Sequence, residues 1–170
     1  MLVGLVLVPS SRASVWGNVA RSAPTIIRGG ESVAENKQYG RISENEFRLA
    51  PDQIETFHRE GCVTIPNVLR ADEVEYFREI FDKFIAGEIH VPGKDFCDMS
   101  KPFGVPYEEW SIVNCMLPTR YYPQLRGNVY EKLTQSMARQ LFETNDMVKD
   151  YDQLLNKRPG QSDAVFAWHQ

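Results

Sequence analysis

The sequence lacks paired cysteines. Its three cysteines, Cys62, Cys97 and Cys115, are an odd number, lie far apart and include no Cys-x-x-Cys pair. This spacing argues against a disulfide framework and against a zinc knuckle. Three reduced thiols fit a reducing, intracellular compartment, and the cytoplasm, the mitochondrial matrix and the peroxisome all stay open.

The sequence also lacks a long apolar run and a block of like charges. No run approaches the roughly 18 apolar residues that a membrane-spanning helix needs, and residues 2–8 form only a short, signal-like stretch. The net charge is -4, so nothing favours nucleic acid or an anionic membrane as a partner. With 170 residues, of which 42% are hydrophobic, the chain can form one globular domain with a core.

Residues 1–48 differ in composition from the rest of the chain. Residues 1–30 carry three arginines, four serines and no acidic residue, which is typical of a mitochondrial transit peptide. A poorly ordered leader or a wrongly assigned gene start fits this composition as well. Residues 31–48 are polar and aperiodic, which favours a linker. We therefore expect a poorly ordered leader and linker over 1–48 and a folded domain over 49–170.

Two helices are predicted early in the folded part. Residues 51–60 begin with Pro51, which suits a first helical turn, and are followed by Gly61, which suits the position just past a helix end. Residues 72–86 repeat apolar side chains at helical spacing and are followed by Gly87. The apolar residues of this second stripe are Val74, Phe77, Ile80, Phe81, Phe84 and Ile85. Such a stripe indicates core packing rather than a ligand-binding surface.

A third helix is predicted over residues 129–143. Asn128 followed three residues later by Glu131 resembles a capping box at its start. Residues 110–117 are apolar and fit either a strand or a buried helix. Residues 87–109 are rich in proline and glycine without periodicity, which indicates a partly ordered loop near the mouth of a site.

Three strands are predicted from alternation and β-branched residues. They cover residues 62–65, 147–156 and 165–170, and the last two are joined by a turn at Pro159 and Gly160. In a strand, residues i and i+2 face the same side, so a His-x-Asp pair can bind one metal ion with both side chains. The last strand ends in Trp168, His169 and Gln170, and could supply the histidine of such a pair.

Three stretches of this sequence resemble the phytanoyl-CoA dioxygenase family of Fe(II)- and 2-oxoglutarate-dependent oxygenases. Residues 57–69 are similar to the opening helix and strand of the family. Residues 152–160 are similar to its asparagine-lysine-proline turn before the iron-binding strand, and residues 168–170 to its His-Gln-Asp iron motif without the aspartate. The resemblance covers about residues 49–170, the amino-terminal half of a typical member.

The resemblance implies an α+β fold in which helices precede the first strands of a double-stranded β-helix, also called a jelly roll or cupin-like core. It implies Fe(II) and 2-oxoglutarate as cofactors, an unknown small-molecule substrate, and hydroxylation of an aliphatic carbon. His169 matches the first iron ligand of the family. Gln153 and Lys157 share strand parity and could face the same interior, which makes them candidate co-substrate or substrate contacts. Lys157 fits an exposed turn position equally well.

The resemblance also implies an aspartate after Gln170, followed by a second histidine and a basic residue that grips 2-oxoglutarate. We therefore expect the chain as given to be a truncated fragment that is inactive by itself. A glycine or alanine in place of the aspartate would leave room for a halide and would make a halogenase possible. A non-catalytic binding or interaction module derived from this fold is the alternative function. An unrelated α+β domain is a third reading.

Overall fold

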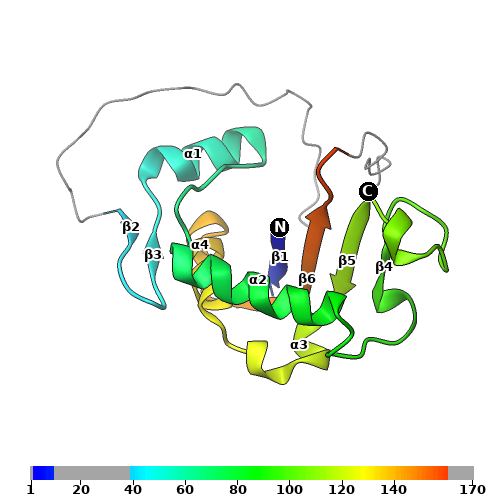
Figure 1. The fold of residues 1–170 in the computed structure, drawn as a ribbon. Helices are drawn as coiled ribbons and strands as arrows, with labels where there is room; N and C mark the ends of the chain where they lie inside the picture. Colours follow the sequence, from blue (N-terminus) through cyan, green and yellow to red (C-terminus); the bar gives the residue numbers. More distant parts are fainter. Residues whose placement is uncertain (1, 10–38, 161–170) are drawn as a thin grey trace. The chain divides into compact units, whose positions relative to one another are not determined.

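The computed structural model describes residues 2–9 and 39–160, and the side chains of residues 39–160. This part of the chain contains both helices and antiparallel strands, which confirms the mixed α and β class (Figure 1). Two compact units are present, one holding residues 70–127 and 149–160, the other residues 39–69 and 128–148. The double-stranded β-helix remains a prediction.

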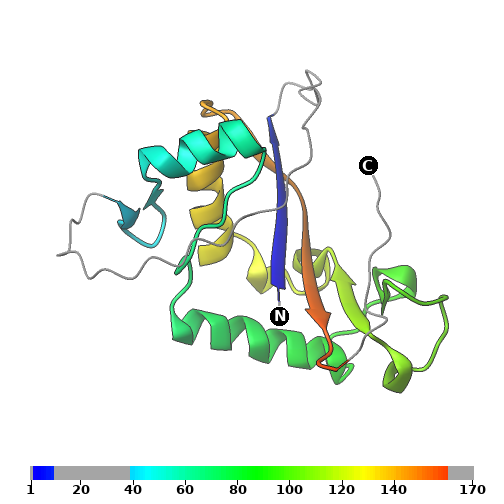
Figure 2. The same cartoon turned by 90° about the horizontal axis from the view of Figure 1, so that it is seen from above.

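The first unit is built on an antiparallel sheet. Its central strand β5 (Ile112–Met116) pairs antiparallel with β4 (Phe96–Asp98) and with β6 (Met147–Lys157). The strand order in the whole sheet is β1-β6-β5-β4, where β1 is Leu2–Pro9. The helix α2 (Ala71–Ile85) crosses one face of this sheet, as the two perpendicular views show (Figures 1 and 2).

The strand register fixes which side chains share a face, because residues directly opposite each other on antiparallel strands point the same way. The first set, which we call the Gln153 face, comprises Cys97, Ile112, Asn114, Met116, Gln153, Leu155 and Lys157. The second set, the Asp98 face, comprises Phe96, Asp98, Val113, Cys115, Asp152, Leu154 and Asn156. Four successive residues of β5, Ile112 to Cys115, are buried, so both of its faces are covered.

The helix α2 confirms the prediction for residues 72–86. The Glu73 carboxylate accepts a hydrogen bond from the Arg70 N–H at 2.8 Å, which fixes the start of the helix. Its buried side chains are Phe77, Ile80, Phe81 and Phe84. Val74 was predicted on the same apolar stripe, but it is 47% exposed, because the stripe is covered only from Phe77 onward.

The second unit is centred on α4 (Val129–Leu141). Leu133 and Met137 of this helix pack with Phe47 and Leu49 into a buried cluster. Five partly buried residues surround the cluster: Ile54, Ile65, Val68, Val129 and Leu141. The core of this unit thus joins residues about 90 positions apart in the sequence, as the contacts between Phe47 and the helix show.

The predicted linker was wrong for residues 40–48, which belong to the second unit. β2 (Gly40–Arg41) pairs antiparallel with β3 (Phe47–Arg48). Phe47 is buried and anchors the segment, whereas Ile42 is exposed. The mean composition of residues 31–48 concealed the importance of Phe47, and one buried aromatic side chain is enough to attach a short hairpin.

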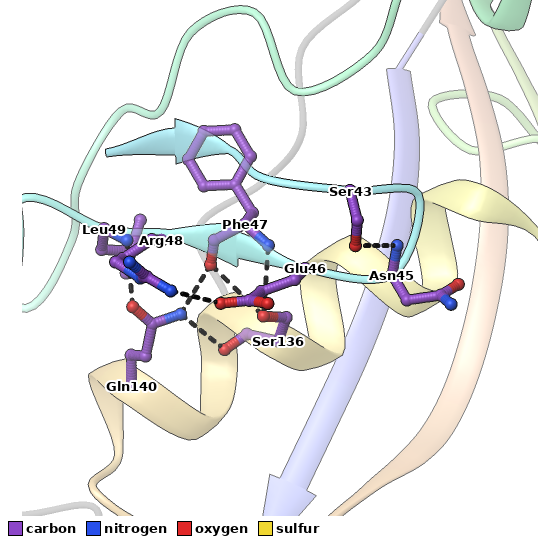
Figure 3. Close-up of polar contacts among 8 residues, drawn as sticks. All are labelled: Ser43, Asn45, Glu46, Phe47, Arg48, Leu49, Ser136 and Gln140. Carbon is purple, nitrogen blue, oxygen red and sulfur yellow. Dashed lines mark hydrogen bonds and ion pairs between the residues drawn. The ribbon is translucent and has the colours of Figure 1, made fainter. Parts of the chain in front are cut away.

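Two side chains of α4 hydrogen-bond the backbone of β3 and of Leu49, the residue that follows it (Figure 3). The Ser136 hydroxyl accepts from the Phe47 N–H at 3.3 Å and donates to the Phe47 carbonyl at 3.2 Å. The Gln140 amide donates to the same carbonyl at 2.7 Å and accepts from the Leu49 N–H at 2.9 Å. These side chains satisfy backbone groups that a neighbouring strand would otherwise satisfy.

The first helix, α1 (Pro51–Glu60), has the predicted bounds. Gly61 adopts φ 75° and donates its N–H to the Phe57 carbonyl at 2.8 Å, which ends the helix in the left-handed conformation that glycine tolerates best. The strand predicted for residues 62–65 was wrong. The segment is irregular, because a strand requires a pairing partner and none lies beside it among the described residues.

The remaining predictions had mixed outcomes. Residues 110–117 contain the strand β5 and no helix. The side chain of Asn128 accepts a hydrogen bond from the Glu131 N–H at 2.9 Å, as the capping motif predicts. The helix α4 ends at Leu141, two positions before the predicted end.

Residues 87–109, predicted as a partly ordered loop, contain β4 and two short 3-10 helices, η1 (Gly93–Asp95) and η2 (Tyr107–Glu109). The two other short helices are α3 (Pro118–Tyr121) and η3 (Pro123–Leu125).

Some predictions fall on residues outside the described ranges. These are the transit peptide, apart from residues 2–9, and the strand over residues 165–170. The strand β6 confirms the prediction for residues 147–156, and Pro159 and Gly160 form the predicted turn. Among the helices of the described part, none is long and apolar enough to cross a membrane.

Candidate functional site

His169, the predicted iron ligand, lies outside the described residues. The structure describes the segment that leads toward it, which is β6 and the turn at Pro159 and Gly160. Within residues 39–160, no group of three or more His, Cys, Asp or Glu side chains is placed to hold a metal ion. The metal site therefore remains a prediction that rests on the motif at residues 168–170.

Gln153 and Lys157 lie on the same face of β6, as their strand parity predicts. Gln153 stands opposite Met116 and Lys157 opposite Ile112. Four residues along a strand span about 13 Å, so their backbones are well separated. Lys157 is exposed at the end of the strand, whereas Gln153 is half-buried. The structure thus places both residues on the Gln153 face but does not bring them into contact.

Asn114 is the polar residue that the structure brings to Gln153. The Gln153 Nε2 group donates a hydrogen bond to the Asn114 Oδ1 atom at 2.5 Å. Asn114 is fully buried on β5. Sequence reasoning missed it, although one signal was present: an asparagine interrupts the apolar run Ile112–Met116. A buried amide needs hydrogen-bond partners, so an asparagine in such a run indicates a specific polar contact.

Cys97 stands directly opposite Asn114, on β4. Burial raises the pKa of the Cys97 thiol, the nearby Asp98 carboxylate adds to the rise, and a hydrogen bond from the Asn114 side chain offsets part of it. The thiol donates to the Lys94 carbonyl at 3.1 Å. A thiol with a raised pKa is neutral near pH 7, so Cys97 is a weak nucleophile.

The three side chains form a row across three adjacent strands, which we call the amide row: Cys97 on β4, Asn114 on β5 and Gln153 on β6. The row contains no carboxylate. Chemically, it can donate hydrogen bonds to an oxygen atom and orient it, but it holds no group that transfers a proton near neutral pH.

The Asp98 face carries a buried carboxylate whose hydrogen bonds are complete. Asp98 accepts from the backbone N–H groups of Ser111 and Ile112, the latter at 2.9 Å, and from the N–H and hydroxyl of Ser100 at 2.5 and 2.7 Å. Burial raises the pKa of this carboxyl, but the hydrogen bonds together outweigh it and leave the pKa below its usual value. Asp98 therefore holds the backbone at the start of β5 in place.

Asp152 holds the other end of β5 in a similar way. Its carboxylate accepts from the N–H and hydroxyl of Thr119 at 3.2 and 3.0 Å. Lys149 Nζ lies 3.9 Å from the same carboxylate and 3.4 Å from the Thr119 hydroxyl. Just before α3, Leu117 has φ 53°, a conformation that non-glycine residues rarely adopt. These contacts hold the sharp turn after β5 and indicate a structural role.

The two histidines of the described part do not form a site. His58 Nε2 lies 3.7 Å from the Glu143 carboxylate on the surface of the second unit, and both side chains are at least half exposed. His90 is exposed after α2. Both are therefore surface residues of the described part of the chain.

Comparisons with models of protein families, with curated proteins and with solved structures found no match to this chain.

Proposed function

We propose that this chain forms the amino-terminal part of a non-haem Fe(II)- and 2-oxoglutarate-dependent oxygenase of the phytanoyl-CoA dioxygenase type. One observation carries the proposal: the three motifs that resemble the family occur in the family's order, from Phe57 to Gln170. The strand β6 and the turn at Pro159 and Gly160 support it, because the motif requires a strand and a tight turn shortly before Trp168 and His169.

In this proposal, His169 supplies a neutral imidazole nitrogen to the metal, a donor that Fe(II) accepts well. When bound, iron and 2-oxoglutarate supply the oxidation of an aliphatic carbon. The sheet of the first unit provides the wall of the site. Gln153 and Lys157 would contact the co-substrate or the substrate from the Gln153 face, Gln153 as a hydrogen-bond donor and Lys157 as a positive charge.

The test is the release of succinate from 2-oxoglutarate by the longest in-frame product of the gene, with Fe(II) and candidate aliphatic substrates. We expect turnover by the parent protein and its loss in His169→Ala. The matched control is His58→Ala, since His58 lies on the exposed surface of α1.

Equal turnover by His169→Ala and the parent would contradict the assignment of the ligand. Absence of both turnover and iron binding in the longest product would contradict the oxygenase function. That second result would favour the alternative, a non-catalytic binding module derived from the same fold.

A further inference from the structure

Arg158, the residue that follows β6, is bound to the segment before β5 through both its backbone and its side chain. Its N–H donates to the Ser111 carbonyl at 3.0 Å, which adds one bond to the β5–β6 pairing beyond the last pair, Ile112 and Lys157. Its guanidinium donates through Nη1 to the Glu108 carbonyl at 3.1 Å. Arg158 is therefore held at both ends.

The guanidinium of Arg158 also stacks on a row of aromatic rings. It lies over the Tyr107 ring, 4.2 Å from the centroid. The ring centroids of Tyr107 and Trp110 are 5.2 Å apart, as are those of Trp110 and Phe96. The Trp110 Nε1 group donates to the Val105 carbonyl at 2.8 Å, which fixes the indole. These four side chains, which we call the arginine stack, join the end of β6 to β4, the edge strand of the sheet.

Two other pairs of a cation and an aromatic ring in the first unit show what distinguishes Arg158. Lys94 Nζ lies 5.9 Å from the Phe103 centroid, and the Arg120 guanidinium lies 5.8 Å from the Tyr121 centroid. Both of these cations are exposed and at longer distance, whereas Arg158 is half-buried and combines stacking with hydrogen bonds. A planar guanidinium suits this combination, because its face stacks while its edge donates.

The place of Arg158 in the chain gives the arginine stack a consequence beyond stability. Pro159 and Gly160 follow it directly. The ring of proline restricts φ to about -65°, and Gly160 adopts φ 76°. A turn with restricted torsion angles starts from the point where Arg158 holds the backbone. A shift of that point therefore changes the direction in which the chain leaves the sheet, ahead of the motif at residues 168–170.

We propose that Arg158 is a positioning residue for the motif that contains His169. In this proposal the arginine stack fixes the start of the turn after β6, and the turn sets where the following segment begins. The inference rests on the proposed function in so far as His169 binds iron. The effect of Arg158 on the turn itself requires no iron and is measured separately.

The first measurement uses the ¹⁵N-labelled full chain without iron. Arg158→Ala and Tyr107→Leu should each speed hydrogen exchange of the residue 158 amide about tenfold and lower the order parameter of the Gly160 amide. Exchange of the central amides of β5 should change less than about twofold. Tyr107→Phe keeps the ring and should behave like the parent. Arg120→Ala, which removes a cation–aromatic pair away from the turn, is the matched control.

The second measurement follows succinate release by the longest in-frame gene product as the concentration of Fe(II) is varied. Arg158→Ala and Tyr107→Leu should raise the Fe(II) concentration for half-maximal rate about tenfold, the effect of losing groups that orient a metal ligand. Tyr107→Phe and Arg120→Ala should change it less than about twofold. A merely stabilising contact would instead lower the melting temperature and leave the Fe(II) dependence unchanged. Tyr107→Leu decides the test if Arg158→Ala does not fold.

Three results would overturn the proposal. Unchanged exchange at residue 158 in both variants would show that the arginine stack does not hold the turn. Faster exchange with an unchanged Fe(II) dependence would reduce Arg158 to a stabilising contact, while the oxygenase function stands. Absence of succinate release and of iron binding in the parent would remove the proposed function, and the role of Arg158 toward His169 with it. The exchange measurement would still report on the turn, so the two failures are distinguishable.

Discussion

Asp98 and Asn114 occupy opposite faces of the same sheet, and both are buried polar residues. Asp98 accepts four hydrogen bonds, whereas the Asn114 amide accepts one, from Gln153, and contacts the Cys97 thiol. A buried polar group whose hydrogen bonds are complete stabilises the fold, and one that lacks a partner destabilises it. At the residue scale, the four hydrogen bonds indicate a structural role for Asp98.

Asp98→Asn should destabilise the protein by about 2 kcal/mol at pH 7, because an amide NH₂ would face backbone N–H groups that now donate to a carboxylate. The pKa of Asp98 is lower in the folded state than in the unfolded chain. Its stabilisation is therefore fully present above about pH 4, the ordinary range of aspartate, and is lost as the pH falls toward the folded pKa. Urea unfolding at several pH values measures both effects.

The matched control is Asp150→Asn, an exposed carboxylate on β6. It should change the free energy of unfolding by less than about 0.5 kcal/mol. If Asp98→Asn lost as little stability as the control, or kept the acid dependence of the parent, the anchoring role of Asp98 would be refuted.

At the scale of elements, side chains of α4 take the hydrogen-bonding place of a third strand beside β3. Ser136 and Gln140 bond the backbone of β3 where a third strand would normally pair (Figure 3). A two-residue strand pair is too short to be stable alone. The contact between β3 and α4 therefore determines whether residues 40–48 fold.

Gln140→Leu should destabilise the second unit by about 1–2 kcal/mol, because the Leu49 N–H and the Phe47 carbonyl lose a bond each while partly buried. Hydrogen exchange of the Leu49 amide should become faster, and amides of β5 in the first unit should change little. Gln124→Leu, at an exposed position of η3, is the control for adding a leucine. Unchanged exchange at Leu49 would show that Gln140 is dispensable.

At the scale of the whole molecule, the folded chain separates its three cysteines, all of which are free, by exposure. Cys62 is exposed, Cys97 is partly buried and Cys115 is buried on β5. Burial raises the pKa of Cys115 to about 12, and the Asp152 and Asp95 carboxylates add to the rise. Because the thiolate is the reactive form, a buried thiol with a raised pKa reacts only when the structure opens.

The native protein should therefore react rapidly with one equivalent of a thiol reagent, slowly with a second, and with the third only as fast as the first unit unfolds. Cys62→Ser should remove the rapid phase alone, and denaturant should make all three thiols react together. A rapid reaction of Cys115 in the native state, located by peptide mass, would contradict the packing of β5.

The sequence by itself determined the three main helices. A helix satisfies its backbone within one segment, so local signals are sufficient: the apolar spacing of residues 72–86, the asparagine at position 128 and the glycine at position 61. The strand β6 and the turn at Pro159 and Gly160 could also be predicted from the sequence, because alternation and turn residues are signals between neighbouring residues. The motif at residues 168–170 is likewise a property of the sequence alone.

The tertiary structure decided the rest, because a strand is completed by residues far away in the chain. β5 is buried on both faces, so its sequence carries no alternation, and only pairing with β4 and β6 shows that it is a strand. Residues 62–65 have strand composition but find no pairing strand among the described residues, whereas the segment before Leu49 folds because one phenylalanine reaches α4. Asn114 meets Gln153 for the same reason: 39 positions of sequence separate them, and the register of two strands brings their amides together.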